Sequence, residues 1–341
     1  MSRLTHAVAG PYAPPVPRRE LTVTSADGSR LHVEDHGPRN APAVVLAHGW
    51  TCSIAFWAPV VRVLAADHRV IVYDQRGHGR SPAPGPGGYS TDALADDLEA
   101  VLGQTLEPGE RAVLAGHSMG GMTAMAAAGR PGVGERVAAV LLCSTGSSNL
   151  AAESRVIPLR SERGRRRAHR ALLSSRAPLG PVTPLTKRVL KYATMGPGTS
   201  PEKVAACARI VHACPVGVRG KWGRVLATLD LDSALDGLTV PTAVIAGTAD
   251  RLTPVVHARR LAARLSNCVG LTELTGLGHM TPIEAPEAVT GVIRELVRDH
   301  LVAAGVEAGR IPAADKAAAP APAPASGPGV VPVAVPEGES S

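Results

Sequence analysis

A serine between two glycines is the feature of this chain that points most directly to chemistry. The sequence Gly-His-Ser-Met-Gly occupies residues 116–120, after the apolar run 112–115 and before the small-residue stretch 121–128. A strand, this turn and a helix together form a nucleophile elbow, which lifts the serine hydroxyl above a sheet edge. The flanking glycines remove side chains that would collide in so sharp a turn. Ser118 is therefore the candidate nucleophile, and the alternative is a purely structural turn.

A serine hydroxyl attacks poorly until a base takes its proton, and that base needs an orienting carboxylate. His279 follows the glycine-rich residues 276–278, and Asp250 follows the apolar run 243–246. The order serine, acid, histidine along the chain is a known order for such a triad. We therefore predict His279 as the base and Asp250 as its partner. The alternatives are a loop histidine at a helix end and an aspartate that only forms a turn before Pro254.

An attacked carbonyl also needs two backbone N–H donors for its developing negative charge. The residue after the nucleophile, Met119, supplies one of them in the predicted turn. We predict the second at Trp50, in the loop His48-Gly49-Trp50 after the apolar run 43–47. The Trp50 indole is expected either to wall the pocket or to pack in the core. His117, beside the serine, is expected to point elsewhere.

Short apolar runs separated by helical patterns must position these residues. Such runs are typical of strands that are covered on both faces, and the intervening helices imply a mostly parallel sheet. Two alternating segments around 21–34 predict an antiparallel hairpin at its edge. The predicted strands are 43–47, 70–73, 112–115, 137–143, 243–246 and 271–274. The predicted helices between and after them are 92–106, 255–265 and 287–302.

The domain organisation follows from where these patterns are interrupted. We predict a core formed by residues 20–144 and 240–304, with residues 145–239 inserted as a helical lid. The helices expected in the lid are 162–173, 184–192, 201–212 and 218–229. Residues 1–19, with four prolines, are expected to form a flexible lead-in, and the Ala/Pro-rich residues 305–341 a disordered tail.

Composition narrows the function classes. The 341 residues are 45% hydrophobic but only 2% aromatic, which disfavours base-stacking readers of single-stranded nucleic acid. Five scattered cysteines and no secretion pattern predict a reduced, cytoplasmic setting, and no apolar run approaches the roughly 18 residues of a transmembrane helix. His212 lies near Cys207 and Cys214, but a fourth metal ligand is missing, so packing is favoured over a metal.

The predicted lid contains a basic run. Eight arginines and one acid, Glu162, lie between Arg155 and Arg176, within a chain of net charge +7. One hypothesis is attraction of an anionic substrate, an acyl carrier, an anionic membrane surface or an acidic partner. The other is an ordinary solvated helix face. Nucleic acid is disfavoured as a partner because no recognition module accompanies the run.

Together, these motifs resemble the α/β-hydrolase superfamily from about Leu21 to Ala304. His48-Gly49-Trp50 is similar to the family's oxyanion motif, residues 73–81 to its loop after the next strand, and residues 116–120 to its elbow. The overall pattern resembles the lidded, esterase-like branch that includes cofactor-free haloperoxidases and ester or lactone hydrolases. That resemblance implies an α/β-hydrolase fold, an acyl-enzyme intermediate, and no metal or organic cofactor.

The resemblance also separates branches of chemistry. Relatives that transfer alkyl groups use an aspartate nucleophile, whereas this position is Ser118, which favours acyl chemistry. The other position for the acid, within 144–147, contains no carboxylate. We therefore expect hydrolysis of a small-molecule carboxylic ester, or a lactone or thioester, with a largely apolar acyl group. The alternatives are perhydrolase or haloperoxidase-like chemistry, acyl transfer or carbon–carbon hydrolysis on the same triad, and a ligand-binding protein on this fold.

Overall fold

The computed structural model describes residue 10 and residues 12–303 of the chain. The predicted tail, 305–341, and residues 1–9 and 11 of the predicted lead-in lie outside the described residues. The described part is built around one eight-stranded sheet of order β1-β2-β4-β3-β5-β6-β7-β8. Its strands are β1 (Arg19–Thr24), β2 (Arg30–His36), β3 (Ala43–Ala47), β4 (Arg69–Tyr73), β5 (Ala112–His117), β6 (Val137–Cys143), β7 (Thr242–Gly247) and β8 (Cys268–Leu274).

The sheet is mostly parallel, with one antiparallel edge. β1 pairs antiparallel with β2, and β2 antiparallel with β4, whereas the other neighbours run parallel. Parallel neighbours require crossover connections, and helices supply them here. The hairpin and the strand positions expected from the sequence are confirmed.

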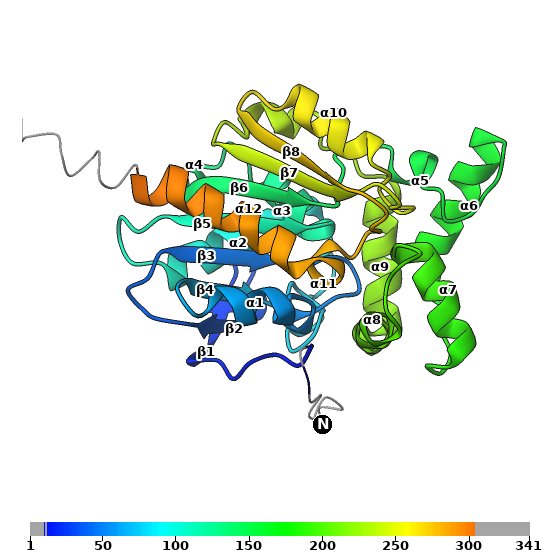
Figure 1. Cartoon of the computed structure of the whole chain (residues 1–341), viewed down its shortest axis with the longest axis horizontal. Helices are drawn as coiled ribbons and strands as arrows, with labels where there is room; N and C mark the ends of the chain where they lie inside the picture. Colours follow the sequence, from blue (N-terminus) through cyan, green and yellow to red (C-terminus); the bar gives the residue numbers. More distant parts are fainter. Residues whose placement is uncertain (1–9, 11, 304–341) are drawn as a thin grey trace, which may run out of the picture.

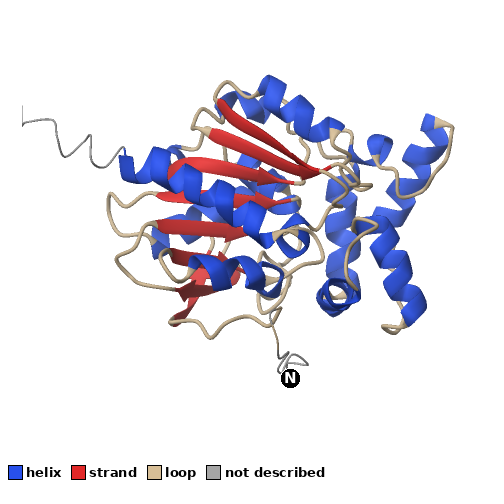
Figure 2. Ribbon diagram, in the orientation of Figure 1, coloured by secondary structure: helices blue, strands red, loops and turns tan. Residues whose placement is uncertain are grey.

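Alternate residues of the central strands pack into two separate cores, one on each face of the sheet. On β3, Val45 belongs to one core, while Val44 and Leu46 belong to the other. Each strand residue is thus covered, which is why the strands read as continuous apolar runs. Figure 2 shows helices on both sides of the sheet. α2 (Thr91–Thr105), α3 (Met119–Ala126) and α10 (Val256–Arg264) contribute to the first core, and α1 (Ala58–Leu64) and α12 (Pro286–Val297) to the second.

Local sequence signals set the helix boundaries. Ser90 caps α2 by accepting the Ala93 N–H at 3.1 Å, and α12 begins at a proline, which needs no N–H partner there. The helix predicted to reach residue 302 changes at Arg298 into a π-helical turn, η3 (Arg298–Val302). The short elements are η1 (Ile54–Trp57), α4 (Pro131–Gly134), α5 (Leu150–Glu153), η2 (Ser233–Gly237) and α11 (Thr281–Glu284).

Four longer helices connect β6 to β7. They are α6 (Glu162–Ser174), α7 (Pro184–Thr194), α8 (Pro201–Ala213) and α9 (Val216–Ala227), here called the inserted helices. Ser161, Thr183 and Ser200 cap the first three of them. Figure 1 shows them gathered beyond the carboxyl ends of the parallel strands, where loops of such sheets carry functional residues. None of the helices in the described ranges is long and apolar enough to cross a bilayer.

Candidate active site

Ser118 lies in a strained turn between β5 and α3. Its backbone has φ 51° and ψ −113°, a conformation that a non-glycine residue rarely adopts. The Ser118 N–H donates to the carbonyl oxygen of Cys143 at 2.9 Å. A Cβ atom on Gly116 would collide with the backbone of Gly120, and one on Gly120 would collide with the Ala47 carbonyl. The glycines therefore let the turn press against the neighbouring strand, as the sequence motif predicts.

Asp250 and His279 meet above the carboxyl ends of β7 and β8. Asp250 Oδ2 lies 2.7 Å from His279 Nδ1. The other carboxylate oxygen accepts the backbone N–H groups of Leu252 at 2.8 Å and Thr253 at 3.0 Å. An ionised carboxylate only accepts hydrogen bonds, so Nδ1 carries the proton and Nε2 is left with its lone pair. This is the tautomer that a general base needs.

Thr253 is a third member of this cluster that the sequence reasoning missed. Its hydroxyl oxygen lies 2.9 Å from Asp250 Oδ2, 3.1 Å from His279 Nδ1 and 3.0 Å from the Ser144 carbonyl oxygen. The single hydroxyl proton of Thr253 cannot be donated to all of these neighbours at once. Which neighbour accepts it depends on the protonation of the imidazole and the carboxylate beside it. In the sequence, Thr253 appears only as one residue of a polar turn.

Ser118 and His279 open into one cavity of about 360 Å³. No hydrogen bond joins the Ser118 hydroxyl to the His279 ring within the described residues. Such contacts often form only in the complex with substrate. Except for the candidate catalytic groups, His117, His169, Arg219 and a few hydroxyls, the lining is apolar, and Trp50 contributes its one indole surface. The apolar lining includes Trp50, Met122, Leu150, Val156, Leu172, Leu173, Leu179, Leu190, Val211, Leu226, Leu252 and Met280.

The loop that contains Trp50 runs directly beside the nucleophile. A Cβ atom on Gly49 would lie 3.2 Å from Ser118 Cβ and 2.7 Å from His117 Nδ1, so only glycine fits. The backbone N–H groups of Trp50 and Met119 donate to no acceptor in the described part of the chain. Met119 is also the first residue of α3, where unpaired N–H groups favour negative charge. The Trp50 indole donates to the Arg219 carbonyl at 3.0 Å, which fixes the ring at the cavity wall.

The expectation that His117 points elsewhere needs correction. Its ring centre lies 4.9 Å from that of His279, and its Nε2 lies 2.9 Å from the His279 carbonyl oxygen. Burial, assisted by the neighbouring His279, lowers the pKa of His117 far below its ordinary value. The ring is therefore neutral and donates through Nε2 to that carbonyl. Because β5 ends at His117 with its side chain toward the β8 loop, this residue supports the loop that carries the candidate base.

Gln75, in the loop after β4, links the Trp50 loop to the nucleophile helix. Its backbone N–H donates to His48 Nε2 at 3.0 Å, and its side-chain amide donates to the His48 carbonyl. In return, the Thr123 hydroxyl of α3 donates to Gln75 Oε1 at 2.8 Å. These contacts fix the distance between the two predicted oxyanion donors, since one lies in each linked segment.

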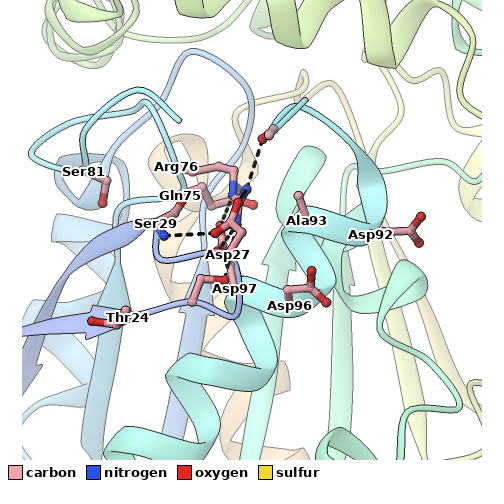
Figure 3. Close-up of polar contacts among 12 residues, drawn as sticks. Thr24, Asp27, Ser29, Gln75, Arg76, Ser81, Asp92, Ala93, Asp96 and Asp97 are labelled. Atoms are coloured by element: carbon pink, nitrogen blue, oxygen red, sulfur yellow. Dashed lines mark hydrogen bonds and ion pairs between the residues drawn. The ribbon is translucent and has the colours of Figure 1, made fainter. Parts of the chain in front are cut away.

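Arg76, the next residue in the loop after β4, fixes this loop through ion pairs. Figure 3 shows its guanidinium close to both Asp27 and Asp97. It donates to Asp97 at 2.6 and 2.5 Å and to Asp27 at 2.8 Å, and it is fully buried. The Arg76 carbonyl accepts the indole N–H of Trp222 on α9 at 3.2 Å. One residue thus joins the hairpin, α2 and the inserted helices to the segment that supports the site.

Two buried histidines make this support sensitive to acid. Burial lowers the pKa of His48 to about 3 and that of His78 to about 4. Both rings accept backbone N–H groups at Nε2, from Gln75 at 3.0 Å and from Thr51 at 3.3 Å. Protonation would turn each acceptor into a donor that faces a donor.

We therefore expect acid to destabilise the folded chain. In the unfolded chain both histidines have a pKa of about 6.5. Below that pH the unfolded state binds more protons than the folded state, so the free energy of unfolding decreases until the pH reaches the pKa values of the folded state, about 4 for His78 and about 3 for His48. Between pH 7 and pH 5, each imidazole should lower the free energy of unfolding by roughly 2 kcal/mol. The measurement is the urea midpoint of unfolding at each pH. His78→Gln, whose amide oxygen can replace Nε2, should weaken this pH dependence. A midpoint unchanged from pH 7 to pH 5 would contradict the assignment.

Among the residues that the structure describes, the one cluster of possible metal ligands lies away from the candidate site. Within the described residues, Glu20, His32 and Glu34 bring ligand atoms within 4.8 Å of one another, on β1 and β2. Arg80 already pairs with Glu20 at 2.8 and 2.9 Å, which makes this group a poor cation site. His212 Nδ1 lies 2.8 Å from the Ala208 carbonyl of its own helix.

The chain is similar in sequence and in structure to known hydrolases. A family model described as the alpha/beta hydrolase fold matches residues 42–286. The provisionally named carbamate hydrolase RutD of Variovorax paradoxus (strain S110) is 34% identical over 253 residues, covering 73% of this chain and 89% of that protein. A non-heme chloroperoxidase of Streptomyces lividans is 28% identical over 278 residues, covering 79% and 96%. A thermophilic esterase from Thermogutta terrifontis superposes with a TM-score of 0.65 at 27% identity, covering 82% and 98%.

Proposed function

The chain belongs to the alpha/beta hydrolase fold family, as its motifs predict, and from that membership we propose that it is a serine hydrolase of carboxylic esters with largely apolar acyl groups. The observation that carries the proposal is the combination of the 2.7 Å contact between Asp250 and His279 with the strained Ser118 at the same cavity. The esterase similar in structure and the hydrolase similar in sequence support the same class of reaction.

The proposed mechanism assigns one role to each residue. Ser118 Oγ attacks the ester carbonyl while His279 Nε2 takes its proton, and Asp250 stabilises the imidazolium through Nδ1. The N–H groups of Trp50 and Met119 hold the oxyanion. His279 then protonates the leaving alcohol, which departs and leaves an acyl group on Ser118. A water molecule, deprotonated by the same imidazole, releases the acid and restores the serine.

The cavity supports an apolar acyl group. Aliphatic side chains and the methionines Met122 and Met280 form most of its wall. Arg219, its one permanently charged lining residue, donates to the carbonyls of Ser175 and Ala177 on the chain's own backbone. In this proposal, the inserted helices act as a lid that encloses the acyl chain, since α6 to α9 supply much of the lining.

A panel of p-nitrophenyl esters of increasing acyl length tests this proposal. Each methylene that enters the cavity contributes about 0.8 kcal/mol, so kcat/KM should rise by about fourfold per carbon until the cavity is full and then fall. Lactones and thioesters run alongside would identify the leaving group. A profile that falls from the acetyl ester onward would contradict an apolar acyl site.

A second candidate reaction is perhydrolysis, in which hydrogen peroxide replaces water at the acyl-enzyme and releases a peracid. The chloroperoxidase relative is the observation that favours including it. Peracid formation from an ester and peroxide would be measured beside simple hydrolysis. A serine-reactive phosphonate separates both reactions from a binding protein on this fold, because only an enzyme should form an adduct at Ser118.

A further inference from the structure

Most of the large apolar side chains that the structure shows exposed lie in one region. In the described ranges, twelve large hydrophobic residues are exposed, and seven of them lie between residues 159 and 192. On α7, Leu185, Val189 and Tyr192 follow one another at helical spacing and are 71%, 59% and 45% exposed. A stripe with this spacing normally faces a core. The other four are Leu159, Leu172, Leu179 and Val182, on α6 and on the segments flanking it.

The same region carries the excess positive charge of the chain, since the remaining residues together have a net negative charge. Residues 155–200 contain eleven lysines and arginines and one acid, whereas the rest of the chain contains 25 and 28, respectively. Within the described residues, none of these eleven cations forms an ion pair. Arg163, Arg166, Arg167 and Arg170 are all exposed along α6. Figure 1 shows α6 and α7 at the end of the molecule, farther from the sheet than α9.

The cavity opens within this region. Leu172 and Leu179 are exposed by 48% and 41%, and both also line the cavity that contains Ser118. A molecule held at the outer surface of α6 and α7 would therefore lie next to the entrance of the candidate active site.

From these observations, we propose that the outer helices α6 and α7 dock on an anionic lipid surface. Helices that lie in a membrane interface combine apolar side chains with a lysine- and arginine-rich polar face, as here. Each cation near such a surface adds attraction, and Glu162 is the one carboxylate among the eleven cations of residues 155–200. An acidic protein would also attract the arginines, but it would leave the exposed apolar stripe on α7 unexplained. A docked protein could take an ester substrate from the lipid surface into the cavity, and this part of the proposal rests on the proposed function. The docking itself does not depend on that function.

Sedimentation of the full chain with lipid vesicles tests the docking. The unmodified protein should bind vesicles of phosphatidylcholine with phosphatidylglycerol, fail to bind phosphatidylcholine alone, and detach in high salt. The variant R163Q/R166Q/R167Q/R170Q should bind on the order of a thousandfold more weakly, at about 1 kcal/mol per charge. L185S/V189S, which changes no charge, should also weaken binding.

A matched control removes four exposed arginines elsewhere. R19Q/R30Q/R39Q/R298Q has the same net charge as the first variant and should bind like the unmodified chain. Equal losses in the two variants, strong binding to neutral vesicles, or no binding to anionic ones would each overturn the docking. Circular dichroism checks that every variant is folded. Hydrolysis of a short, dissolved ester, measured in parallel, should be the same in all variants, and its absence throughout would count against the proposed function alone.

Discussion

Ser118→Ala should lower kcat for ester hydrolysis by on the order of 10⁴-fold or more. The variant loses the one oxygen that can become the acyl ester, and the oxyanion donors alone give only residual catalysis. The fold should be unaffected, because the Ser118 hydroxyl makes no hydrogen bond within the described residues and alanine has the same Cβ atom at φ 51°. The measurements are kcat with the preferred p-nitrophenyl ester and the urea midpoint of each protein.

Ser144→Ala provides a matched control. Ser144 is also buried and also has a positive φ, 44°, but its hydroxyl faces Thr281 at 3.1 Å rather than the cavity. This substitution should cost about 1 kcal/mol of stability through the lost hydrogen bond and should leave kcat within roughly tenfold. Turnover by Ser118→Ala at the unmodified rate would rule out Ser118 as the nucleophile. Loss of phosphonate labelling in that variant gives a second, independent reading.

The central strands β3 to β7 were predictable because both of their faces are buried. Val44 and Val45 pack into different cores, so neither position could be polar, and the apolar run ends where the strand ends. The positions of Ser118, Asp250 and His279 followed for a related reason. In a parallel sheet, residues just beyond the carboxyl ends of strands meet at one edge, whatever their separation along the chain.

Polar contacts between residues far apart along the chain were not predictable in this way. Trp222 reaches Arg76 across 146 positions, and nothing in the spacing of either residue indicates the other. Thr253 occupies a turn that many hydroxyl residues could fill. The ring of His117 was assigned the wrong direction because the strand pattern fixes where its backbone lies but not which loop packs above it.

Asp250→Asn should produce the second large loss, on the order of 10⁴-fold in kcat. The N–H groups of Leu252 and Thr253 hold Oδ1, so the asparagine carbonyl must take that position and its amide group must face His279 Nδ1. The amide donates, which forces the imidazole proton onto Nε2 and leaves no lone pair for Ser118.

Thr253→Val separates this tautomer effect from the general polarity of the cluster. Valine keeps the shape of threonine but removes the hydroxyl that lies 2.9 Å from Asp250 and 3.1 Å from His279. The ring keeps Asp250 as its acceptor, so the tautomer is unchanged, and the loss in kcat should stay near tenfold, the scale of one hydrogen bond. Both variants should fold, as judged by urea midpoints at pH 7. Equal losses in the two would mean that Thr253, and not the carboxylate, fixes the imidazole proton, whereas full activity of Asp250→Asn would remove Asp250 from the mechanism.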